Sequence, residues 1–418
     1  MATFAFHGDL VWAERPDRLE TLPGGYLLIQ GNSILGVQAE RPSCPVEEHP
    51  GSLVLPGLYD LHLHAPQYAY CGLWMDEELL DWLERHTFPT EARYKDPAFA
   101  SASYRCLVND IARSGTARFS MFGTIHADAT LGLMAMLEDA GLSGFVGKVN
   151  MDRNSPDYYR EGTEESLRET ERFLDASERF ENIRPIITPR FTPSCTDSLL
   201  EGLGRLARER NVPVQSHLDE NLSEIEWVRE LCPWAKSYAG TYERYGLFGS
   251  TPTIMAHCIY LDEGELRLMR ENGVYAAHAP SSNANVSSGI APVRRFLEMG
   301  INTGLASDVA GGSSLSIFRA VTDAVQASKL RWRCVDTSER ALSFSEAFYL
   351  ATKGGGSFFG KAGSFEPGYE ADVLVIEDGE GGSVLHNELT VPERLEYYTY
   401  RHPEEFIKAK LVGGRRII

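Results

Sequence analysis

The residues His62-Leu63-His64 are the first in the chain whose types and spacing could do chemistry. They end an apolar segment, LVLPGLYDLHLH, that begins at Leu53 and contains a Pro56-Gly57 turn before the histidines. Successive side chains of a β-strand point to opposite faces, so His62 and His64 project together, whereas residues i and i+2 of a helix point apart. The pair alone predicts either half of a metal site or two hydrogen-bonded histidines in a buried strand.

Three further residues with metal-binding side chains each follow an apolar run: His217 in QSHLDE, His257 in IMAHC and Asp308 in GLASD. Together with His62 and His64 they form a set of imidazoles and one carboxylate that suits a divalent ion, above all Zn²⁺. A coordination position left open for water would indicate catalysis. His257 fits two roles, a ligand of the ion or a neighbour that polarises the attacking water.

Glu220 lies three residues beyond His217. A carboxylate beside a metal-activated water, but not bound to the ion, is the usual general base. The alternative is a glutamate in the first turn of a helix, since Ser223 and Glu226 follow it. We predict that Glu220 is catalytic.

The motifs that are absent narrow the class of enzyme. The fourth expected strand ends in Pro189-Arg190, so it lacks a lysine that could bridge two ions, and one ion per chain is predicted. The sequence contains no HExxH, which excludes the common zinc protease motif. It also contains no HxE followed by PCxxC, the signature of an unrelated deaminase fold.

The elements that must position these residues begin at Gly57, where short apolar runs start to alternate with segments of helical periodicity. This alternation predicts an α/β protein, a (β/α)₈ TIM-type barrel over residues 57–366, whose active site lies at the carboxyl ends of its strands. The eight expected strands are Leu58–His64, Thr116–Met121, Gly144–Asn150, Arg184–Arg190, Pro213–Leu218, Thr253–Cys258, Val274–His278 and Thr303–Asp308. Helices are expected at Glu77–His86, Ser198–Glu209, Leu222–Leu231, Asp262–Glu271 and Pro292–Met299.

The two ends of the chain have a different pattern, with short β-type runs separated by Pro and Gly turns. The expected strands are Thr3–Phe6, Tyr26–Gln30 and Ser33–Val37 at the start, and Ala371–Ile376 and Lys408–Ile418 at the end. We predict that residues 1–56 and 367–418 together form a small β-sandwich domain.

The composition limits the class of partner. The 418 residues include 40 Lys and Arg against 59 Asp and Glu, and the net charge of -19 argues against nucleic acid or an anionic membrane as a partner. A small neutral substrate fits. The 7 cysteines are scattered and odd in number, which suits free thiols in the cytoplasm. No apolar run is long enough for a membrane span or a secretory signal.

The motifs PGLYDLHLH, QSHLDE, MAHC, SDVAGG and ADVLVI are similar to those of the amidohydrolase superfamily and cover nearly the whole chain. Longer strings resemble the guanine deaminase family within it. These strings are HLHAPQY at 62–68, LLDWLERHTFPTEARY at 79–94, TIHAD at 124–128, FVGKVNMD at 145–152, TPRF at 188–191 and SDVAGG at 307–312.

This resemblance implies a zinc-dependent hydrolytic deamination of guanine to xanthine and ammonia, and usually a homodimer. It implies that His62, His64, His217 and Asp308 bind one Zn²⁺, with His257 at or near the ion and Glu220 as the proton shuttle. It further implies that Gln67 and Arg190 contact the purine edge and that Phe191 lines the pocket for the ring. The remaining residues that it implies for substrate binding are His217, Glu220 and Asp308.

Two other functions fit the same residues. The metal site could act on a different aminated ring, such as a pterin, an oxidised guanine or a triazine, although Gln67, Arg190 and Phe191 favour guanine. A non-catalytic scaffold on the same fold would be expected to have lost metal-binding residues, and this chain keeps all of them together with Glu220.

Overall fold

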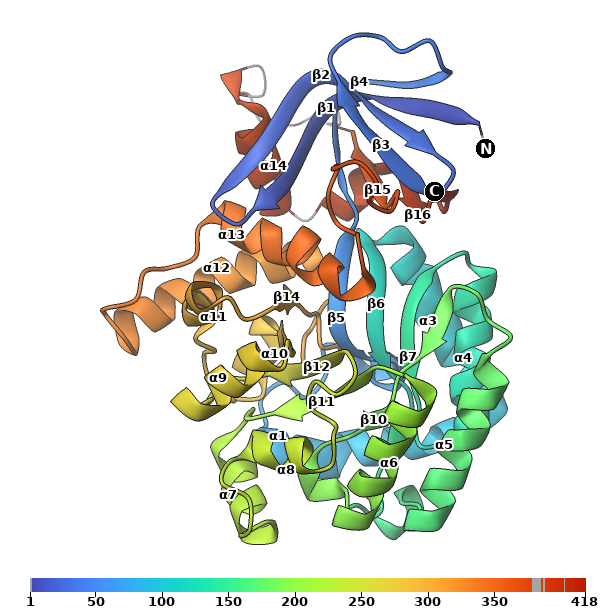
Figure 1. Cartoon of the computed structure of the whole chain (residues 1–418), viewed down its shortest axis with the longest axis vertical. Helices are drawn as coiled ribbons and strands as arrows, with labels where there is room; N and C mark the ends of the chain where they lie inside the picture. Colours follow the sequence, from blue (N-terminus) through green and yellow to red (C-terminus); the bar gives the residue numbers. More distant parts are fainter. Residues whose placement is uncertain (1, 378–384, 386–387, 402) are drawn as a thin grey trace.

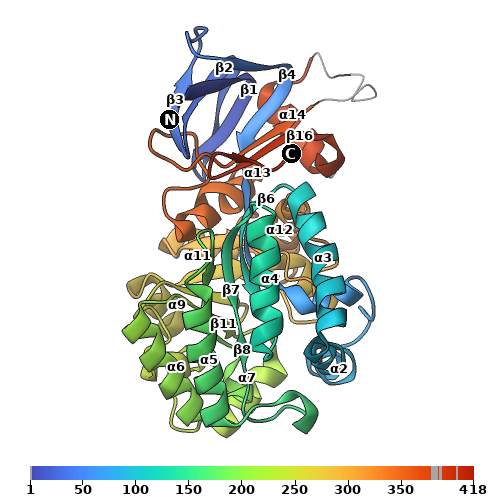
Figure 2. The same cartoon turned by 90° about the vertical axis from the view of Figure 1, so that its right-hand side faces the viewer.

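The computed structural model describes residues 2–377, 385, 388–401 and 403–418. A β-sheet built from both ends of the chain lies at one end of the molecule, and a larger body of strands and helices lies at the other (Figures 1 and 2). The metal-type residues all belong to the larger body.

Two four-stranded parallel sheets form the middle of this body, in the orders β5-β6-β7-β9 and β11-β12-β13-β14. Every residue of β5, β6, β11 and β12 is buried, as expected for strands covered on both faces. The strands are β5 (Leu58–His64), β6 (Thr116–Phe122), β7 (Ser143–Gly147), β9 (Ile183–Pro185), β11 (Val214–Leu218), β12 (Thr253–His257), β13 (Tyr275–His278) and β14 (Thr303–Leu305). All eight predicted strand segments contain strand.

A third, two-stranded sheet pairs β8 (Val149–Asn150) in parallel with β10 (Thr188–Pro189), and these strands follow β7 and β9 in the chain. Its strands complete the third and fourth predicted segments, each of which is interrupted once. An apolar cluster that includes Leu61, Ile186 and Ile254 draws its members from both four-stranded sheets. The two sheets therefore share an interior.

Helices pack around the outside of these sheets (Figure 2). The predicted helix at Leu222–Leu231 is confirmed at both bounds as α7, and Asn221 caps its first turn. The helices are α1 (Leu79–Trp82), α2 (Phe88–Ala92), α3 (Pro97–Arg113), α4 (Ala127–Asp139), α5 (Thr163–Ser177), α6 (Asp197–Arg210), α7, α8 (Tyr238–Arg244), α9 (Glu263–Glu271), α10 (Pro280–Asn285), α11 (Val293–Met299), α12 (Ile317–Cys334), α13 (Phe344–Tyr349) and α14 (Val391–Thr399). The expected helix at Glu77–His86 is divided into α1 and a π-helical turn, η2 (Leu83–Thr87).

The strands of the two chain ends form one seven-stranded sheet in the order β17-β16-β15-β4-β1-β2-β3. We expected a sandwich of two sheets, but β4 pairs with β1 on one side and β15 on the other, which joins all the strands into one sheet. One cluster of buried apolar side chains, including Phe6, Ile29 and Val375, packs on it. The strands are β1 (Thr3–Arg15), β2 (Arg18–Gln30), β3 (Ser33–Gln38), β4 (Val46–Pro56), β15 (Val373–Ile376), β16 (Ile407–Val412) and β17 (Arg415–Arg416).

The structure thus confirms an α/β protein with parallel strands and outer helices. No helix within the described part of the chain is long and apolar enough to cross a membrane.

Candidate active site

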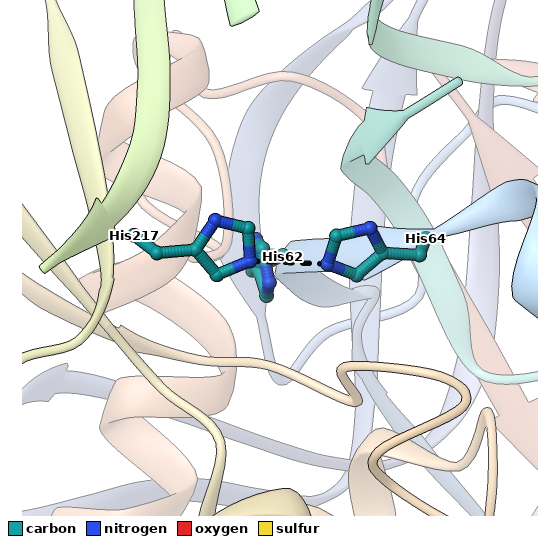
Figure 3. Close-up of side chains that lie close together, drawn as sticks. All are labelled: His62, His64 and His217. Carbon is teal, nitrogen blue, oxygen red and sulfur yellow. Dashed lines mark hydrogen bonds between the residues drawn. The ribbon is translucent and has the colours of Figure 1, made fainter. Parts of the chain in front are cut away.

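Four histidines from three strands and one aspartate from the loop after β14 meet at the carboxyl ends of the parallel strands. His64 Nε2 lies 3.1 Å from His217 Nε2, and the rings of His62 and His64 are 4.9 Å apart (Figure 3). Asp308 Oδ1 lies 3.1 Å from His62 Nε2 and 3.6 Å from His64 Nε2. Asp308 Oδ2 is 3.7 Å from His257 Nε2, so the carboxylate contacts three imidazoles. The structure brings together all the residues predicted to bind the metal.

The hydrogen bonds of two of the imidazoles set their tautomers. Nδ1 of His217 is 2.6 Å from the carbonyl oxygen of Arg190, and Nδ1 of His257 is 2.9 Å from Oδ1 of Asn283. Both partners are acceptors, so each Nδ1 carries the proton and donates it. The lone pair of each Nε2 therefore points into the cluster, which is the usual orientation of a histidine that binds a metal.

The remaining imidazole nitrogens test whether a cation fits. Both ring nitrogens of His62 and Nδ1 of His64 are buried and make no well-directed hydrogen bond to any described residue. Buried polar atoms are normally paired, because an unpaired one loses its hydration without compensation. Two sets of side chains, His62-His64-His217 and His62-His257-Asp308, have ligand atoms within 4.8 Å of one another. The donor atoms and their geometry fit one divalent cation.

The electrostatics of the cluster also favour a cation. Burial lowers the pKa of His62, and it lowers the pKa values of His64 and His217 well below the ordinary value, with neighbouring imidazoles adding to the effect in the last two. These three rings are therefore neutral and can offer lone pairs. Burial also opposes a charge on His257, but the carboxylates of Glu220 and Asp308 outweigh it and raise its pKa.

The ends of β12 and β14 hold their side chains in an unusual backbone conformation. His257 has φ 71° and Asp308 has φ 45°, both in the left-handed region that few residues other than glycine adopt. The N–H of Asp308 donates to the carbonyl of His62 at 2.9 Å, which fixes the loop after β14 against β5. Such backbone strain is common where side chains must be aimed at a functional site.

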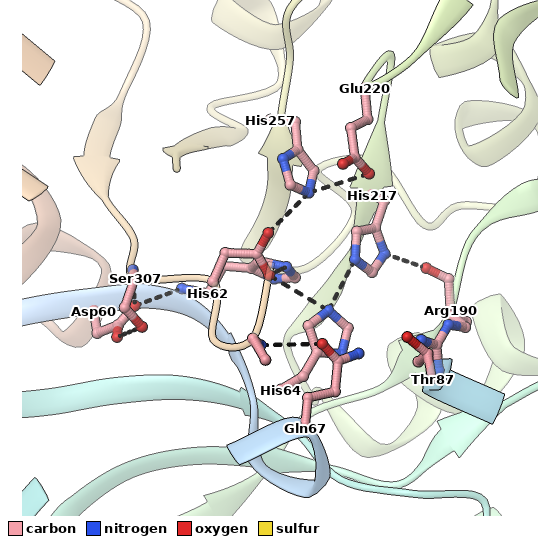
Figure 4. A network of polar contacts seen from close by, with 12 residues as sticks. Asp60, His62, His64, Gln67, Thr87, Arg190, His217, Glu220, His257 and Ser307 are labelled. Carbon is pink, nitrogen blue, oxygen red and sulfur yellow. Dashed lines mark hydrogen bonds and ion pairs between the residues drawn. The ribbon is translucent and has the colours of Figure 1, made fainter. Parts of the chain in front are cut away.

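Asp60, two residues before His62 on the same strand, strengthens the same connection. Its carboxylate accepts hydrogen bonds from the N–H and Oγ of Ser307 and from the N–H of His62, at 3.0, 2.5 and 3.2 Å (Figure 4). Burial raises the pKa of Asp60 to about 7, against the effect of these donors. Asp60 thus joins the strand that carries His62 to the segment that carries Asp308.

Glu220 follows β11 and is 4% exposed, with Oε2 lying 3.4 Å from His257 Nε2 and Oε1 accepting from Ser288 Oγ at 3.2 Å. Figure 4 shows it beside His257 and directed at the cluster. Burial, together with the charges of Glu224 and Asp308, raises its pKa to about 7, although His257 acts in the opposite direction. The helix α7 begins only at Leu222, and Glu224 is the acid that caps its start. Glu220 therefore lies one residue before the cap Asn221 and outside the first turn of α7.

Arg190 and Gln67 lie on another wall of the same site. Arg190 is 2% exposed and makes a two-pronged ion pair with Glu91, with Nη1–Oε2 and Nη2–Oε1 distances of 2.7 and 3.2 Å. Burial opposes the charge of Arg190, but Glu91 outweighs it and raises its pKa. Gln67 Nε2 donates to Glu91 Oε1 at 3.0 Å, and Gln67 Oε1 accepts from the N–H of Ala310 at 3.1 Å.

A small cavity of about 30 Å³ connects the two groups of polar side chains. Its lining includes the predicted residues His64, Gln67, Arg190, Phe191, His217, Glu220, His257 and Asp308. Leu79, Trp82 and Leu83 cover it, and these are buried residues of α1 and η2. His62 does not line the cavity, but its ring packs against that of His217, with the ring centroids 4.8 Å apart.

Three features of the site were not predicted from the sequence. Glu91, the partner of Arg190, lies within the string LLDWLERHTFPTEARY, but no role was assigned to it. The orienting role of Asn283 depends on α10 reaching β12, which no local pattern reveals. Trp82 is 3% exposed and lines the cavity.

The model of the amidohydrolase family matches residues 53–406. The chain belongs to the amidohydrolase family. As an amidohydrolase it is a hydrolase that acts on carbon–nitrogen bonds, which confirms the predicted class of enzyme.

Relatives of this amidohydrolase support a closer grouping. Guanine deaminase of Rattus norvegicus is 42% identical over 380 residues, covering 87% of this chain and 82% of that protein. Guanine deaminase of Dictyostelium discoideum is 41% identical over 329 residues, covering 78% and 73%. The crystal structure of a guanine deaminase from C. acetobutylicum with bound guanine superimposes with a TM-score of 0.96 at 41% identity and covers 100% of both chains. The resemblance to guanine deaminases is therefore confirmed.

Proposed function

We propose that this amidohydrolase catalyses the hydrolytic deamination of guanine to xanthine and ammonia. The observation that carries the proposal is that one cavity has the His and Asp cluster with Glu220 at one side and the Arg190-Gln67 pair at another. The His and Asp cluster can hold an ion that activates water, and Glu220 can move the protons of that water. Arg190 and Gln67 can bind the polar edge of a purine. The guanine bound to the C. acetobutylicum protein supports the same ligand for this chain.

We propose one Zn²⁺ per chain, held by His62, His64, His217 and Asp308. The nitrogens of His62 and His64 that make no well-directed hydrogen bond to the described residues support an ion at this place, and the presence of His62 in both sets of potential ligands supports a single ion. When bound, the ion would act as a Lewis acid and lower the pKa of water at the site. His257 Nε2 lies 3.4 Å from Glu220 Oε2 and 3.7 Å from Asp308 Oδ2, so this imidazole is placed to act either as a further ligand of the ion or beside the proton shuttle.

Glu220 is the proposed proton shuttle. Its Oε2 takes a proton from water and delivers it to a ring nitrogen of guanine while the water oxygen adds to the amino-bearing carbon. The proton of the new hydroxyl group then passes through Oε2 to the amino group, the C–N bond breaks as the new carbonyl forms, and ammonia leaves. A pKa near 7 suits a group that must both accept and donate protons at neutral pH. Ser288 holds the other carboxylate oxygen and keeps Oε2 toward His257.

Arg190, Gln67 and Phe191 are proposed to bind the purine. The fork of guanidinium N–H groups and the fixed amide can donate to a carbonyl and to an unprotonated ring nitrogen. Phe191 lines the cavity beside them and contacts the plane of the ring. This binding places the carbonyl edge at Arg190 and directs the amino-bearing carbon toward Glu220 and the cluster.

A bound purine needs more space than the structure provides. An engineered cavity of about 150 Å³ holds benzene, whereas this one is about 30 Å³. We propose that α1 and η2 move outward to admit guanine and then return. Leu79, Trp82 and Leu83 would then exclude bulk water from the closed site.

We further infer that the two parallel sheets close into a (β/α)₈ barrel over residues 57–366, with a second domain formed by 1–56 and 367–418. Two connections support closure. The N–H of Ile187 donates to the carbonyl of Pro213 at 2.9 Å beside β11, and the N–H of Asp308 donates to His62 beside β5. The catalytic residues would then all lie at the end of the barrel where such enzymes bind their substrates.

We also propose a homodimer in the cytoplasm. The cysteines described as free at all seven positions suit a reducing compartment. Exposed apolar side chains such as Leu73 and Trp74, at 51% and 42%, are available for a subunit contact. Sedimentation equilibrium of the purified chain would test the dimer.

The proposed activity is tested by incubating the purified, zinc-loaded chain with guanine, adenine, a pterin, 8-oxoguanine and a diaminotriazine, and measuring ammonia. We expect ammonia and xanthine in equal amounts from guanine, at the highest kcat/KM of the set. A higher kcat/KM for the pterin, 8-oxoguanine or the triazine would replace guanine as the substrate. Stoichiometric zinc without turnover of any ring would indicate a scaffold.

A further inference from the structure

Glu91 connects Arg190 and Gln67, which form the proposed purine-binding wall, although Glu91 does not line the cavity itself. It belongs to the short helix α2 and is fully buried, at 0% exposed. Its carboxylate accepts hydrogen bonds from three side chains, Arg190, Gln67 and Tyr159, and the Tyr159 Oη–Oε2 distance is 2.8 Å. These partners come from segments 99, 24 and 68 residues away in the sequence. One carboxylate thus fixes both groups that are proposed to bind the purine.

The contacts of Glu91 decide which atoms of Gln67 face which neighbour. Gln67 Nε2 donates to Glu91, and Gln67 Oε1 accepts from the N–H of Ala310. A rotated amide would place its oxygen against a carboxylate and its NH₂ against an N–H group, and both contacts would be repulsive. The amide therefore has one favourable orientation, in which the hydrogen-bonding groups left for a ligand include an N–H donor.

The same carboxylate determines what Arg190 offers. Its two oxygens receive Nη1 and Nη2, so that the charge of the buried guanidinium is compensated within the protein. A guanidinium has five N–H donors and no acceptor, and the ion pair with Glu91 occupies two of them. Each oxygen of Glu91 already accepts two hydrogen bonds, so the carboxylate has no free direction toward a ligand.

We propose that Glu91 is the positioning residue that sets the substrate specificity of this site. By orienting Gln67 and Arg190, it makes their wall of the pocket a surface of hydrogen-bond donors. Such a surface selects rings with a carbonyl and an unprotonated nitrogen at that edge, and it disfavours rings with an amino group there, because two donors would face each other. This inference rests on the proposed function and extends it to the residue behind the specificity.

The variant Glu91→Gln tests the proposal, with guanine and 2,6-diaminopurine as the two substrates. The second compound carries an amino group in place of the carbonyl, while the amino group to be removed is unchanged. The amide that replaces the carboxylate has one acceptor fewer and no charge, so it no longer opposes a rotated Gln67 and no longer holds both arms of the Arg190 fork. We expect the preference for guanine, measured as the ratio of the two kcat/KM values, to fall by about 100-fold, mainly through a higher KM for guanine.

A second buried pair supplies a matched control. Glu346 accepts from Nη1 and Nη2 of Arg294 at 2.8 and 2.5 Å and is 4% exposed, but it connects α13 to α11 and lines none of the cavity. The variant Glu346→Gln should lower the stability and leave the ratio of the two kcat/KM values at its original value. This control separates the loss of a buried ion pair in general from the loss of Glu91.

Tyr159→Phe covers the case in which Glu91→Gln does not fold. It removes one donor to Glu91 and keeps the ring that packs against Phe88. We expect a fall in the preference of about 5-fold. A folded Glu91→Gln with the original preference would overturn the proposal, and so would an unfolded one combined with an unchanged preference in Tyr159→Phe.

The parent enzyme in the same assay separates a failure of the proposed substrate from a failure of the proposed role of Glu91. If it prefers 2,6-diaminopurine, the proposed substrate is wrong and the role of Glu91 as the source of a donor surface falls with it. If it deaminates guanine and only the variants behave differently from expectation, the proposed function stands and the role of Glu91 is rejected.

Discussion

The two polar groups that meet in the cavity are built in opposite ways. In the histidine cluster, both ring nitrogens of His62 and Nδ1 of His64 make no well-directed hydrogen bond to the described residues. In the wall formed by Gln67, Glu91 and Arg190, which is proposed to bind the purine, both polar side-chain atoms of Glu91 and of Gln67 make hydrogen bonds. Buried ring nitrogens without a well-directed hydrogen bond fit a cation, whereas side chains whose hydrogen bonds are complete form a rigid surface that suits recognition of a ligand.

Among these variants, Glu220→Gln should have the largest effect on activity. It changes a residue beside the histidine cluster without removing a proposed metal ligand. The amide keeps the shape of the carboxylate and its contact with Ser288, but it cannot carry a proton between water and the ring. We expect kcat for guanine to fall by about 10⁴-fold, with the zinc content unchanged. Steady-state kinetics and metal analysis of the same sample check both parts.

A control for this variant is Glu226→Gln, on the same helix that follows Glu220, because the side chain of Glu226 is 65% exposed. It should retain the parent rate. A Glu220→Gln enzyme with more than a tenth of the parent kcat would mean that another group moves the proton.

The variant His257→Gln tests whether this imidazole binds the ion or acts with Glu220 on the attacking water. It lies 3.4 Å from Glu220 and 3.7 Å from Asp308. Were it chiefly a partner of Glu220 and the attacking water, its loss would lower kcat by about 10²- to 10³-fold and leave zinc bound. That is the result we expect, and loss of stoichiometric zinc would instead make His257 a ligand.

Arg190→Lys tests the purine-binding wall. Lysine keeps the charge but not the planar fork, so it can pair with only one side of Glu91. The backbone carbonyl that orients His217 is retained, and the metal site should therefore be unaffected. We expect kcat/KM for guanine to fall by about 100-fold through KM, with bound zinc unchanged. A fall in kcat alone would show that Arg190 does not bind the ground-state purine.

Glu346→Gln should have the smallest effect on activity and a measurable one on stability. Removing one partner of a buried ion pair typically costs about 3 kcal/mol of unfolding free energy, and we expect that loss with an unchanged kcat/KM. Chemical denaturation at neutral pH measures it.

The ion pair of Glu346 with Arg294 also predicts that the stability of the fold depends on pH. Burial alone would raise the pKa of Glu346, but the hydrogen bonds from Arg294 and Arg340 outweigh it and lower the pKa from 4.5 to about 2. Because the folded pKa is the lower one, the stabilisation is fully present above pH 4.5 and is lost as the pH falls toward 2. The difference in stability between parent and variant should shrink over that interval. A constant difference would mean that the charge of Glu346 contributes nothing.

The histidine cluster with Asp308 could be predicted from the sequence because the patterns that reveal its residues are local. A histidine or aspartate at the end of an apolar run is visible without the structure, and the carboxyl ends of parallel strands meet at one edge of the fold. The helix at Leu222–Leu231 was predicted at both bounds for the same reason, since its periodicity and its cap are local.

The purine-binding wall could be predicted only in part. Gln67 and Arg190 were identified through the family resemblance, but Glu91 was not, because its three partners come from distant segments and its own helix, α2, has only five residues. The sheet formed by the two chain ends could also be predicted only in part. β4 (Val46–Pro56) contains Pro50-Gly51, which indicates a turn, and its place between β1 and β15 depends on pairing with both chain ends.

The most direct test of the central claim is the release of ammonia from guanine as zinc is added to the metal-free chain. We predict that ammonia and xanthine form in equal amounts and that the rate rises in proportion to bound zinc until one ion per chain is present. A chain that binds one zinc and leaves guanine unchanged, while it deaminates a pterin or a triazine, would contradict the claim.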